Sequence, residues 1–99
     1  MAVVGNKALS SAQRAVILEV AASHGAINVR LFGSRVREIT GRESDIDLLV
    51  DMRPGQSLLD LIAIEQDLED KLAIRVDVLT EAGLSPYMRE QVLHEVVPL

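Results

Sequence analysis

The stretch that decides the fold reads GSRVREITGRESDIDLLV and occupies residues 33–50. It opens with Gly33 and Ser34 and ends in an apolar run that carries Asp45 and Asp47. Residues two apart on a β-strand point to the same side of the sheet, about 6 to 7 Å from each other. We therefore expect a strand at the end of this stretch, with the two aspartates on one face.

A strand that packs on a small core normally fills its inward face with apolar side chains, as Leu49 does here. Asp45 and Asp47 at the preceding positions of that face repel each other and gain nothing from burial. A break of this kind in the folding pattern tends to mark a functional site. Mg²⁺ explains the break, because it prefers carboxylate oxygen and takes one or two carboxylates together with phosphates and water.

A third acid, Asp77, lies in a later apolar segment between Val76 and Val78, which point to the opposite face of a strand. If this segment lies beside the strand that follows Asp45, the Asp77 side chain lies next to those of Asp45 and Asp47. Three carboxylates suit a centre of two Mg²⁺ ions, one serving the attacking oxygen and one holding a triphosphate in line.

The Asp-x-Asp pair has other interpretations, since such pairs are common in turns and at solvated strand edges, where they bind nothing. A calcium-binding EF-hand loop starting at Asp45 is excluded, because its sixth position is Val50 rather than Gly and its twelfth is Gln56 rather than Glu. Sugar-nucleotide transferases also use Asp-x-Asp, but a chain of 99 residues leaves little room for their nucleotide-binding domain.

The Gly33-Ser34 pair has two interpretations as well. A Gly-Ser pair after a strand is usually a turn. Alternatively, glycine lets the backbone approach a phosphate closely, and Ser34 offers a hydroxyl and an amide at a helix N-terminus, which favours anions. The pair alone does not decide between a turn and a phosphate site.

The remaining sequence predicts one domain, residues 1–99, of the α/β or α+β class, with helices flanking a small mixed sheet. Capping signals frame the helices: Ser10 with Gln13 three residues on, Ser57, and Ser85 before a proline. The expected order is helix 10–24, strand 27–32, a short helical turn to about 38, strand 46–50, helix 58–72, strand 74–79 and helix 87–97. On the first strand, alternation puts Ile27, Val29 and Leu31 on one face.

Composition excludes several classes of function. The net charge is -5 and no run of Lys or Arg is present, so broad nucleic-acid binding by phosphate neutralisation is not expected. Phe32 and Tyr87 are the only aromatic residues, too few for a base-stacking platform. The chain has no cysteine and no apolar run long enough for a membrane span, and from its first ten residues we expect no signal peptide. We expect a cytoplasmic protein without a direct nucleic-acid or membrane partner.

Taken together, these residues resemble the signature of the nucleotidyltransferase fold of the DNA polymerase β superfamily. That signature is a Gly-Ser pair, a short gap, two acidic residues separated by one residue on a strand, and a later third acid. Here Gly33-Ser34, Asp45-Ile46-Asp47 and Asp77 occupy these places. The ending over residues 85–99 is similar to the closing helix of the short stand-alone members.

Those short members are the minimal nucleotidyltransferase antitoxins, which pair with HEPN-domain ribonuclease toxins. The resemblance implies that this chain binds such a toxin in a hetero-oligomer. It also implies, as in some of these systems, a transfer of AMP from ATP to a tyrosine of the toxin, and so a protein adenylyltransferase.

The resemblance implies roles for the residues of the motif. Gly33 and Ser34 would hold triphosphate oxygens, and Arg35 and Ser44 are included as further nucleotide-binding residues. The three carboxylates named above would ligate Mg²⁺, and Asp77 is the best candidate to help activate the acceptor hydroxyl.

One departure from the family pattern leaves the activity open. The family often has Gly-Ser-Arg-Ala-Arg-Gly, whereas this chain has Val36 in place of Ala and Glu38 in place of Gly. Glu38 adds a negative charge close to a triphosphate, which Arg35, Arg37 and Arg42 could offset. Two alternatives therefore remain: an antitoxin that neutralises its toxin by binding and occlusion, and a small acidic domain that binds neither metal nor nucleotide.

Overall fold

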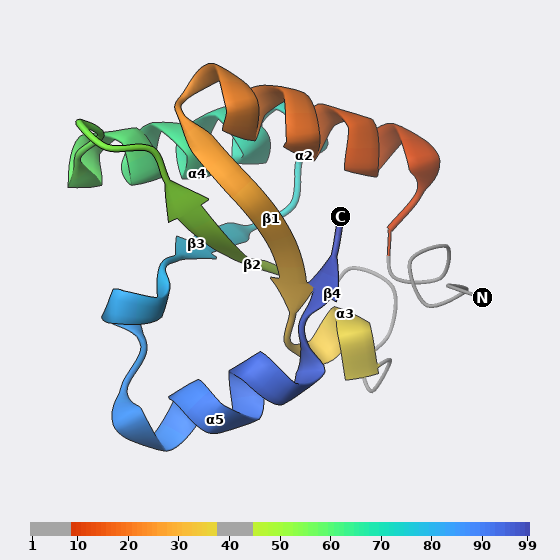
Figure 1. Ribbon diagram of the computed structural model, residues 1–99. Coiled ribbons are helices and arrows are strands. Elements are labelled where there is room, and N and C mark those ends of the chain that lie inside the picture. Colours follow the sequence, from red (N-terminus) through yellow and green to blue (C-terminus); the bar gives the residue numbers. More distant parts are fainter. Residues whose placement is uncertain (1–8, 38–44) are drawn as a thin grey trace.

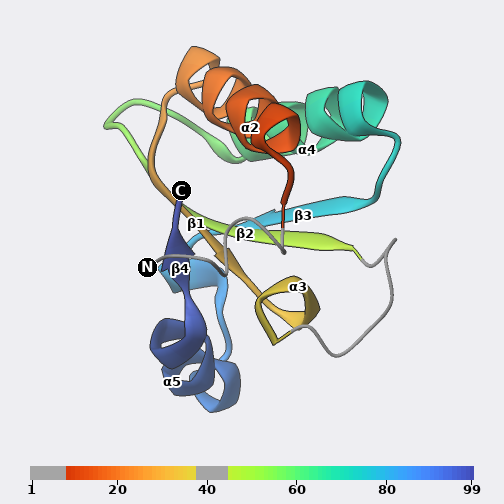
Figure 2. The same cartoon turned by 90° about the vertical axis from the view of Figure 1, so that its right-hand side faces the viewer.

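The computed structural model of the chain describes residues 9–37 and 45–99 and forms a four-stranded mixed sheet with the strand order β3-β2-β1-β4 (Figure 1). Helices α2 and α4 cover one face of this sheet, and α5 lies on the other (Figure 2). The expected small mixed sheet flanked by helices is confirmed. In chain order the elements are α2 (Ser11–Ser23), β1 (Ala26–Phe32), α3 (Ser34–Arg37), β2 (Ile46–Met52), α4 (Leu58–Leu72), β3 (Val76–Leu79), the 3-10 helix η1 (Glu81–Gly83), α5 (Pro86–Glu95) and β4 (Val97–Pro98).

The two long helices begin where their capping residues predict. At the start of α2 the Ser10 hydroxyl accepts the Gln13 N–H and the Gln13 side chain accepts the Ser10 N–H, both at 3.0 Å. Ser57 caps α4 in the same reciprocal way with Asp60. These bonds satisfy amide groups that a helix start leaves without partners. Helix α4 spans Leu58–Leu72, so the predicted helix at 58–72 is confirmed at both ends.

The last strand, β4, was not predicted, and the expected helix over 87–97 is too long. Helix α5 ends at Glu95, and Val97 then pairs with Leu31 of β1 in antiparallel register. The physical reason lies in Pro98, which disfavours helical geometry at the residue before it. The N–H of Leu99 donates to the Val29 carbonyl at 2.9 Å, which ties the end of the chain to β1.

Strand β1 contains a bulge that changes the predicted alternation. Asn28 has a φ of 52°, and between Ile27 and Arg30 the register against β2 slips by one residue. The extra residue turns the start of the strand over, so Ile27 is 36% exposed and Val29 is buried. The expectation that Ile27, Val29 and Leu31 share one face is therefore wrong at Ile27.

Two apolar clusters hold the layers together. The larger one lies between the sheet and helices α2 and α4, and it includes Ile17, Leu48 and Leu68 with no side-chain exposure. The smaller one lies between the sheet and α5 and consists of Phe32, Leu49, Leu84 and Val92. No helix within residues 9–37 and 45–99 combines the length and the apolar character that a membrane span requires.

The apolar side chains that α4 buries against the sheet are expected to contribute to the free energy of unfolding of the domain. We expect Leu68→Ala to lower the free energy of unfolding by about 2 to 5 kcal/mol, because it opens a cavity in the larger cluster. Leu59→Ala on the same helix removes a side chain that is 74% exposed, so it should change stability by less than about 0.5 kcal/mol. Urea unfolding of both variants measures the difference, and equal losses would contradict this packing.

We expect the Asp51 carboxyl group, on the other face of the sheet, to make the stability of the domain depend on pH. The side-chain amide of Asn28 donates to Asp51 at 2.9 Å, and the Arg30 guanidinium lies 3.1 Å from the same carboxylate. These contacts hold the pKa of Asp51 below its ordinary value of 3.8, against the opposing effect of burial. A carboxyl with a lowered pKa stabilises the fold above its ordinary pKa, and that contribution is lost as the pH falls through the lowered value.

We therefore expect Asp51→Asn to be less stable than the wild type near neutral pH, with a difference that shrinks once the pH falls below about 4. Chemical unfolding at a series of pH values measures this. Asp70→Asn, which removes a carboxylate from an exposed position of α4, is the matched control. A constant difference for Asp51→Asn would contradict the role of Asn28 and Arg30.

Candidate functional site

The site is built on the pairing of β2 with β3. These strands run parallel, and Asp47 of β2 lies directly opposite Asp77 of β3 in the register. Neighbouring strands are about 4.8 Å apart, and opposite residues point to the same face. The fold therefore brings two predicted acids together as half-buried neighbours, from positions 30 residues apart in sequence.

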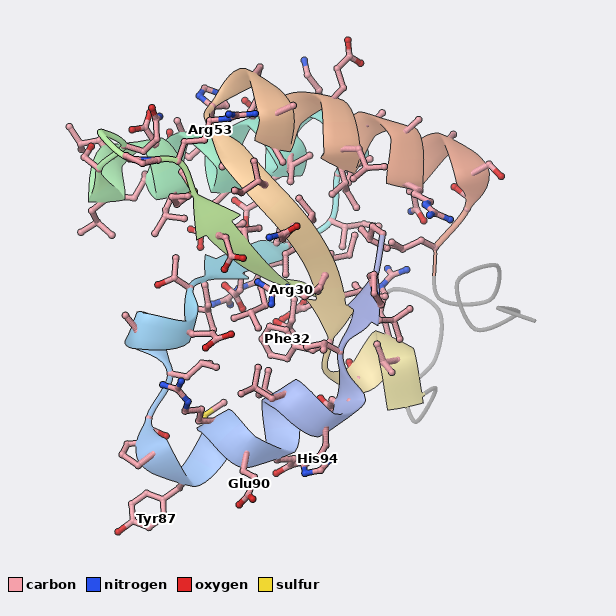
Figure 3. The ribbon with its side chains drawn as sticks, viewed as in Figure 1. Arg30, Phe32, Arg53, Tyr87, Glu90 and His94 are labelled. Atoms are coloured by element: carbon pink, nitrogen blue, oxygen red, sulfur yellow. The ribbon has the colours of Figure 1, made fainter. Side chains whose placement is uncertain are left out.

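Both carboxylates line a cavity of about 400 Å³ between the sheet and α5. Figure 3 shows Phe32 pointing from β1 toward α5, into the layer where this cavity lies. The lining comes from three strands, the turn after β1, and two helices. It consists of Phe32, Gly33, Asp47, Glu65, Asp77, Leu79, Met88, Gln91, Val92 and Glu95.

Gly33 is required at its position for two reasons. Its φ of +87° lies in the left-handed region that side chains rarely adopt, and a Cβ there would overlap Oδ2 of Asp47 and lie 3.1 Å from its Cγ. The Gly33 N–H donates to Glu95 Oε2 at 2.9 Å, from the last residue of α5. Backbone, Asp47 and Glu95 therefore meet in a space that only glycine leaves open.

The cavity is strongly acidic. Four of the described residues that line it carry carboxylates, Asp47, Glu65, Asp77 and Glu95, and none of the described lining residues is basic. Four negative charges in one cavity repel each other and any anionic ligand. Oxygen donors of this kind suit a hard divalent cation, and a pair of carboxylates is the usual protein contribution to a Mg²⁺ site. The residues present therefore fit the predicted ion.

Asp45 differs in its position from the other two predicted acids. It precedes the first residue of β2, its side chain is exposed, and it does not line the cavity. Over residues 9–37 and 45–99, no group of three or more Asp, Glu, His or Cys side chains is arranged to hold a metal ion. The structure thus brings together two of the three predicted acids, and the role of Asp45 stays a prediction.

The remaining predicted residues lie around the turn after β1. Ser34 begins the four-residue helix α3, and Arg35 follows it; both side chains are half-buried. Neither lines the cavity, although Gly33 beside them does. Ser44, predicted to bind nucleotide, and Glu38, the departure from the family pattern, lie outside the described residues.

Two of the four carboxylates that line the cavity, those of Glu65 and Glu95, were not predicted from the sequence. A glutamate in the middle of a helix is typical of a solvated face, but the Glu65 carboxylate accepts the N–H of Val78 on β3 at 2.8 Å. Glu95 carried no local signal, since its partner Gly33 is 62 residues away. The spacing of Glu65 and Glu69, one helical turn apart, is the only pattern that could have pointed to a shared role.

Comparison with known proteins identifies the family. The model of the nucleotidyltransferase domain family matches residues 14–99. A protein of Thermococcus cleftensis named protein adenylyltransferase MntA is 40% identical over 73 residues, which cover 74% of each chain.

Two solved structures resemble this fold. One, described as a candidate minimal nucleotidyltransferase, has 46% identity and a TM-score of 0.76, covering 89% of this chain and 90% of that one. The other, an MNT antitoxin in complex with a tri-AMPylated HEPN toxin of Shewanella oneidensis, has 20% identity and a TM-score of 0.69. It covers 91% of this chain and 71% of that one and shows the fold alone. With its fold, its paired carboxylates and this family match, the chain belongs to the nucleotidyltransferase domain family, as the motif predicted.

Proposed function

We propose that this chain is a Mg²⁺-dependent protein adenylyltransferase of the cytoplasm, which acts as the antitoxin of a HEPN-domain toxin. It would transfer AMP from ATP to a hydroxyl of that toxin, with tyrosine as the expected acceptor. One observation carries the proposal: Asp47 and Asp77 lie opposite each other in an acidic cavity beside Gly33, in a member of the nucleotidyltransferase family.

The known relatives support both the activity and the partner. A relative with 40% identity is named protein adenylyltransferase MntA. A protein of the same fold has been solved as an antitoxin bound to an AMPylated HEPN toxin. Activity and partner are carried from those proteins to this chain as a proposal.

The proposed reaction is a displacement at the α-phosphorus of ATP. The acceptor hydroxyl oxygen forms a bond to the α-phosphorus, the bond to the oxygen that bridges the α- and β-phosphates breaks, and pyrophosphate leaves. The hydroxyl proton passes to a carboxylate, for which Asp77 is the candidate because it lines the cavity. No covalent bond to the protein is required, so the protein acts by positioning and by electrostatics.

The residues of the site have different proposed roles, in phosphate binding and in metal binding. Gly33 keeps the backbone beside Asp47 clear of any side chain, so that a phosphate oxygen can approach, with Ser34 and Arg35 as the next candidates to contact it. Asp47 and Asp77 are the proposed ligands of Mg²⁺, which when bound would neutralise charge on the phosphates. A second ion would depend on Asp45, which remains a proposed ligand.

Removing either paired carboxylate tests the enzyme. We expect Asp47→Asn and Asp77→Asn each to lower the rate of AMP transfer by at least about 100-fold, because neutralising a proposed ligand weakens the metal site. The measurement is transfer of label from ATP labelled at the α-phosphate to the purified toxin in the presence of Mg²⁺. Glu90→Gln is the control, since this residue lies exposed on α5 and points away from the sheet (Figure 3).

Neutralisation by occlusion, without chemistry, is the second candidate function. It is favoured by the position of Asp45 outside the cavity. If wild type and both aspartate variants bind the toxin and protect cells equally well, occlusion explains the protection. If the variants bind the toxin but fail to protect, chemistry is required.

The glycine beside Asp47 offers a second test. We expect Gly33→Ala to reduce binding of Mg-ATP by at least about tenfold, since the added Cβ would displace the Asp47 carboxylate. Gly55→Ala is the matched control: its φ of +92° imposes a similar backbone strain, but an added Cβ there meets no atom within 4 Å. Titration calorimetry measures both, and equal binding by the two variants would argue against a phosphate site at Gly33.

A further inference from the structure

Helix α4 supplies two carboxylates to the outer edge of strand β3. Glu69 Oε2 accepts the Val76 N–H at 3.0 Å, and Glu65 Oε2 accepts the Val78 N–H at 2.8 Å. Both bonds are partly buried. Because β3 is at the end of the strand order, no strand of the described part of the chain lies beside these amide groups, and the two glutamates bond them instead.

The spacing of the two glutamates matches the spacing of the two amides. Residues four apart on a helix are separated by about 6.0 Å along its axis, and residues two apart on a strand by about 6.6 Å. The earlier glutamate bonds the later amide, as expected when the crossover helix runs antiparallel to the strands it joins. Two charge-assisted bonds thus fix both the position of β3 along its own axis and its direction relative to α4.

The residue held between the two amides is Asp77. It lies between Val76 and Val78, and the register of β3 against β2 is what sets it opposite Asp47. A strand of four residues has few ladder bonds of its own, so its outer edge matters for its position. We propose that Glu65 and Glu69 are positioning residues that hold β3 in the register at which Asp77 meets Asp47. This inference deepens the proposed function and rests on it for the catalytic consequence.

Variants of Glu69 distinguish the positioning of β3 from an electrostatic effect on the cavity. Glu65 lines the cavity, so removing it would change the charge around Asp47 and Asp77 as well as the hold on β3. Glu69 makes the same kind of bond but does not line that cavity. A loss caused by Glu69→Ala therefore reports on the position of β3.

The activity test uses three variants on α4. We expect Glu69→Ala to lower kcat for AMP transfer by about 10- to 100-fold, the range expected when a catalytic group shifts by about 1 Å. Glu69→Gln should recover most of the rate, because its amide oxygen accepts the same N–H. Asp70→Ala removes one carboxylate from an exposed position of the same helix and should match the wild type.

Two measurements do not depend on activity. Hydrogen exchange of the Val76 amide should become faster in Glu69→Ala than in Glu69→Gln or Asp70→Ala, and that of Val78 faster in Glu65→Ala than in Glu65→Gln. The affinity for Mn²⁺, used as a probe in place of Mg²⁺, should fall in Glu69→Ala. Thermal unfolding of every variant shows whether it is folded at the assay temperature.

The outcomes separate this inference from the proposed function. Suppose that the Val76 amide exchanges faster in Glu69→Ala but that kcat and the affinity for Mn²⁺ stay at the wild-type values. That result would overturn the positioning role, and Glu69 would then only protect the edge of the sheet. Unchanged exchange would overturn the hold on β3 itself. If the wild type transfers no AMP, the proposed function fails, and the exchange and Mn²⁺ measurements still decide whether the glutamates position Asp77.

Discussion

The parallel pairing of β2 with β3 is the constraint on which the site depends. Parallel neighbours cannot be joined by a tight turn and need a crossover connection, which α4 provides here. Once that helix packs with Leu68 and Ile64 in the larger apolar cluster, Asp47 and Asp77 are brought side by side. The free energy that holds two like charges together therefore comes from apolar burial on the opposite face of the same strands.

That arrangement concentrates negative charge where the fold gains little from it. Glu65 and Glu95 are each compensated by a backbone N–H, of Val78 and of Gly33, whereas Asp77 has an ion pair with Arg75 at 3.9 Å. Arg75 is 69% exposed, so solvent screens this pair and its contribution to stability is small. The exposed ion pair leaves the Asp77 carboxylate able to bind a cation, and an acidic group that stabilises the fold so little is consistent with retention for function.

Sequence reasoning succeeded where the signal is local and failed where the partner is distant. Helix α4 was predicted to the residue because Ser57 caps it and its apolar residues recur at helical spacing. The short strand β4 could not be found that way, since two residues have no periodicity and their partner is β1. For the site, the motif brought out Asp47 and Gly33, while the roles of Glu65 and Glu95 depend on amides that only the fold brings near.

The bulge in β1 illustrates how a distant irregularity sets the site. Ile27 is opposite Asp51 and Phe32 is opposite Asp47, so five steps along β1 match four along β2. Without the extra residue at Asn28, Leu31 would lie opposite Asp47, and every later side chain of β1 would turn to the other face. Phe32 would then leave the cavity, and Gly33 would no longer follow the residue that faces Asp47. The left-handed conformation at Asn28 is therefore as much a requirement of the site as the motif that ends the strand.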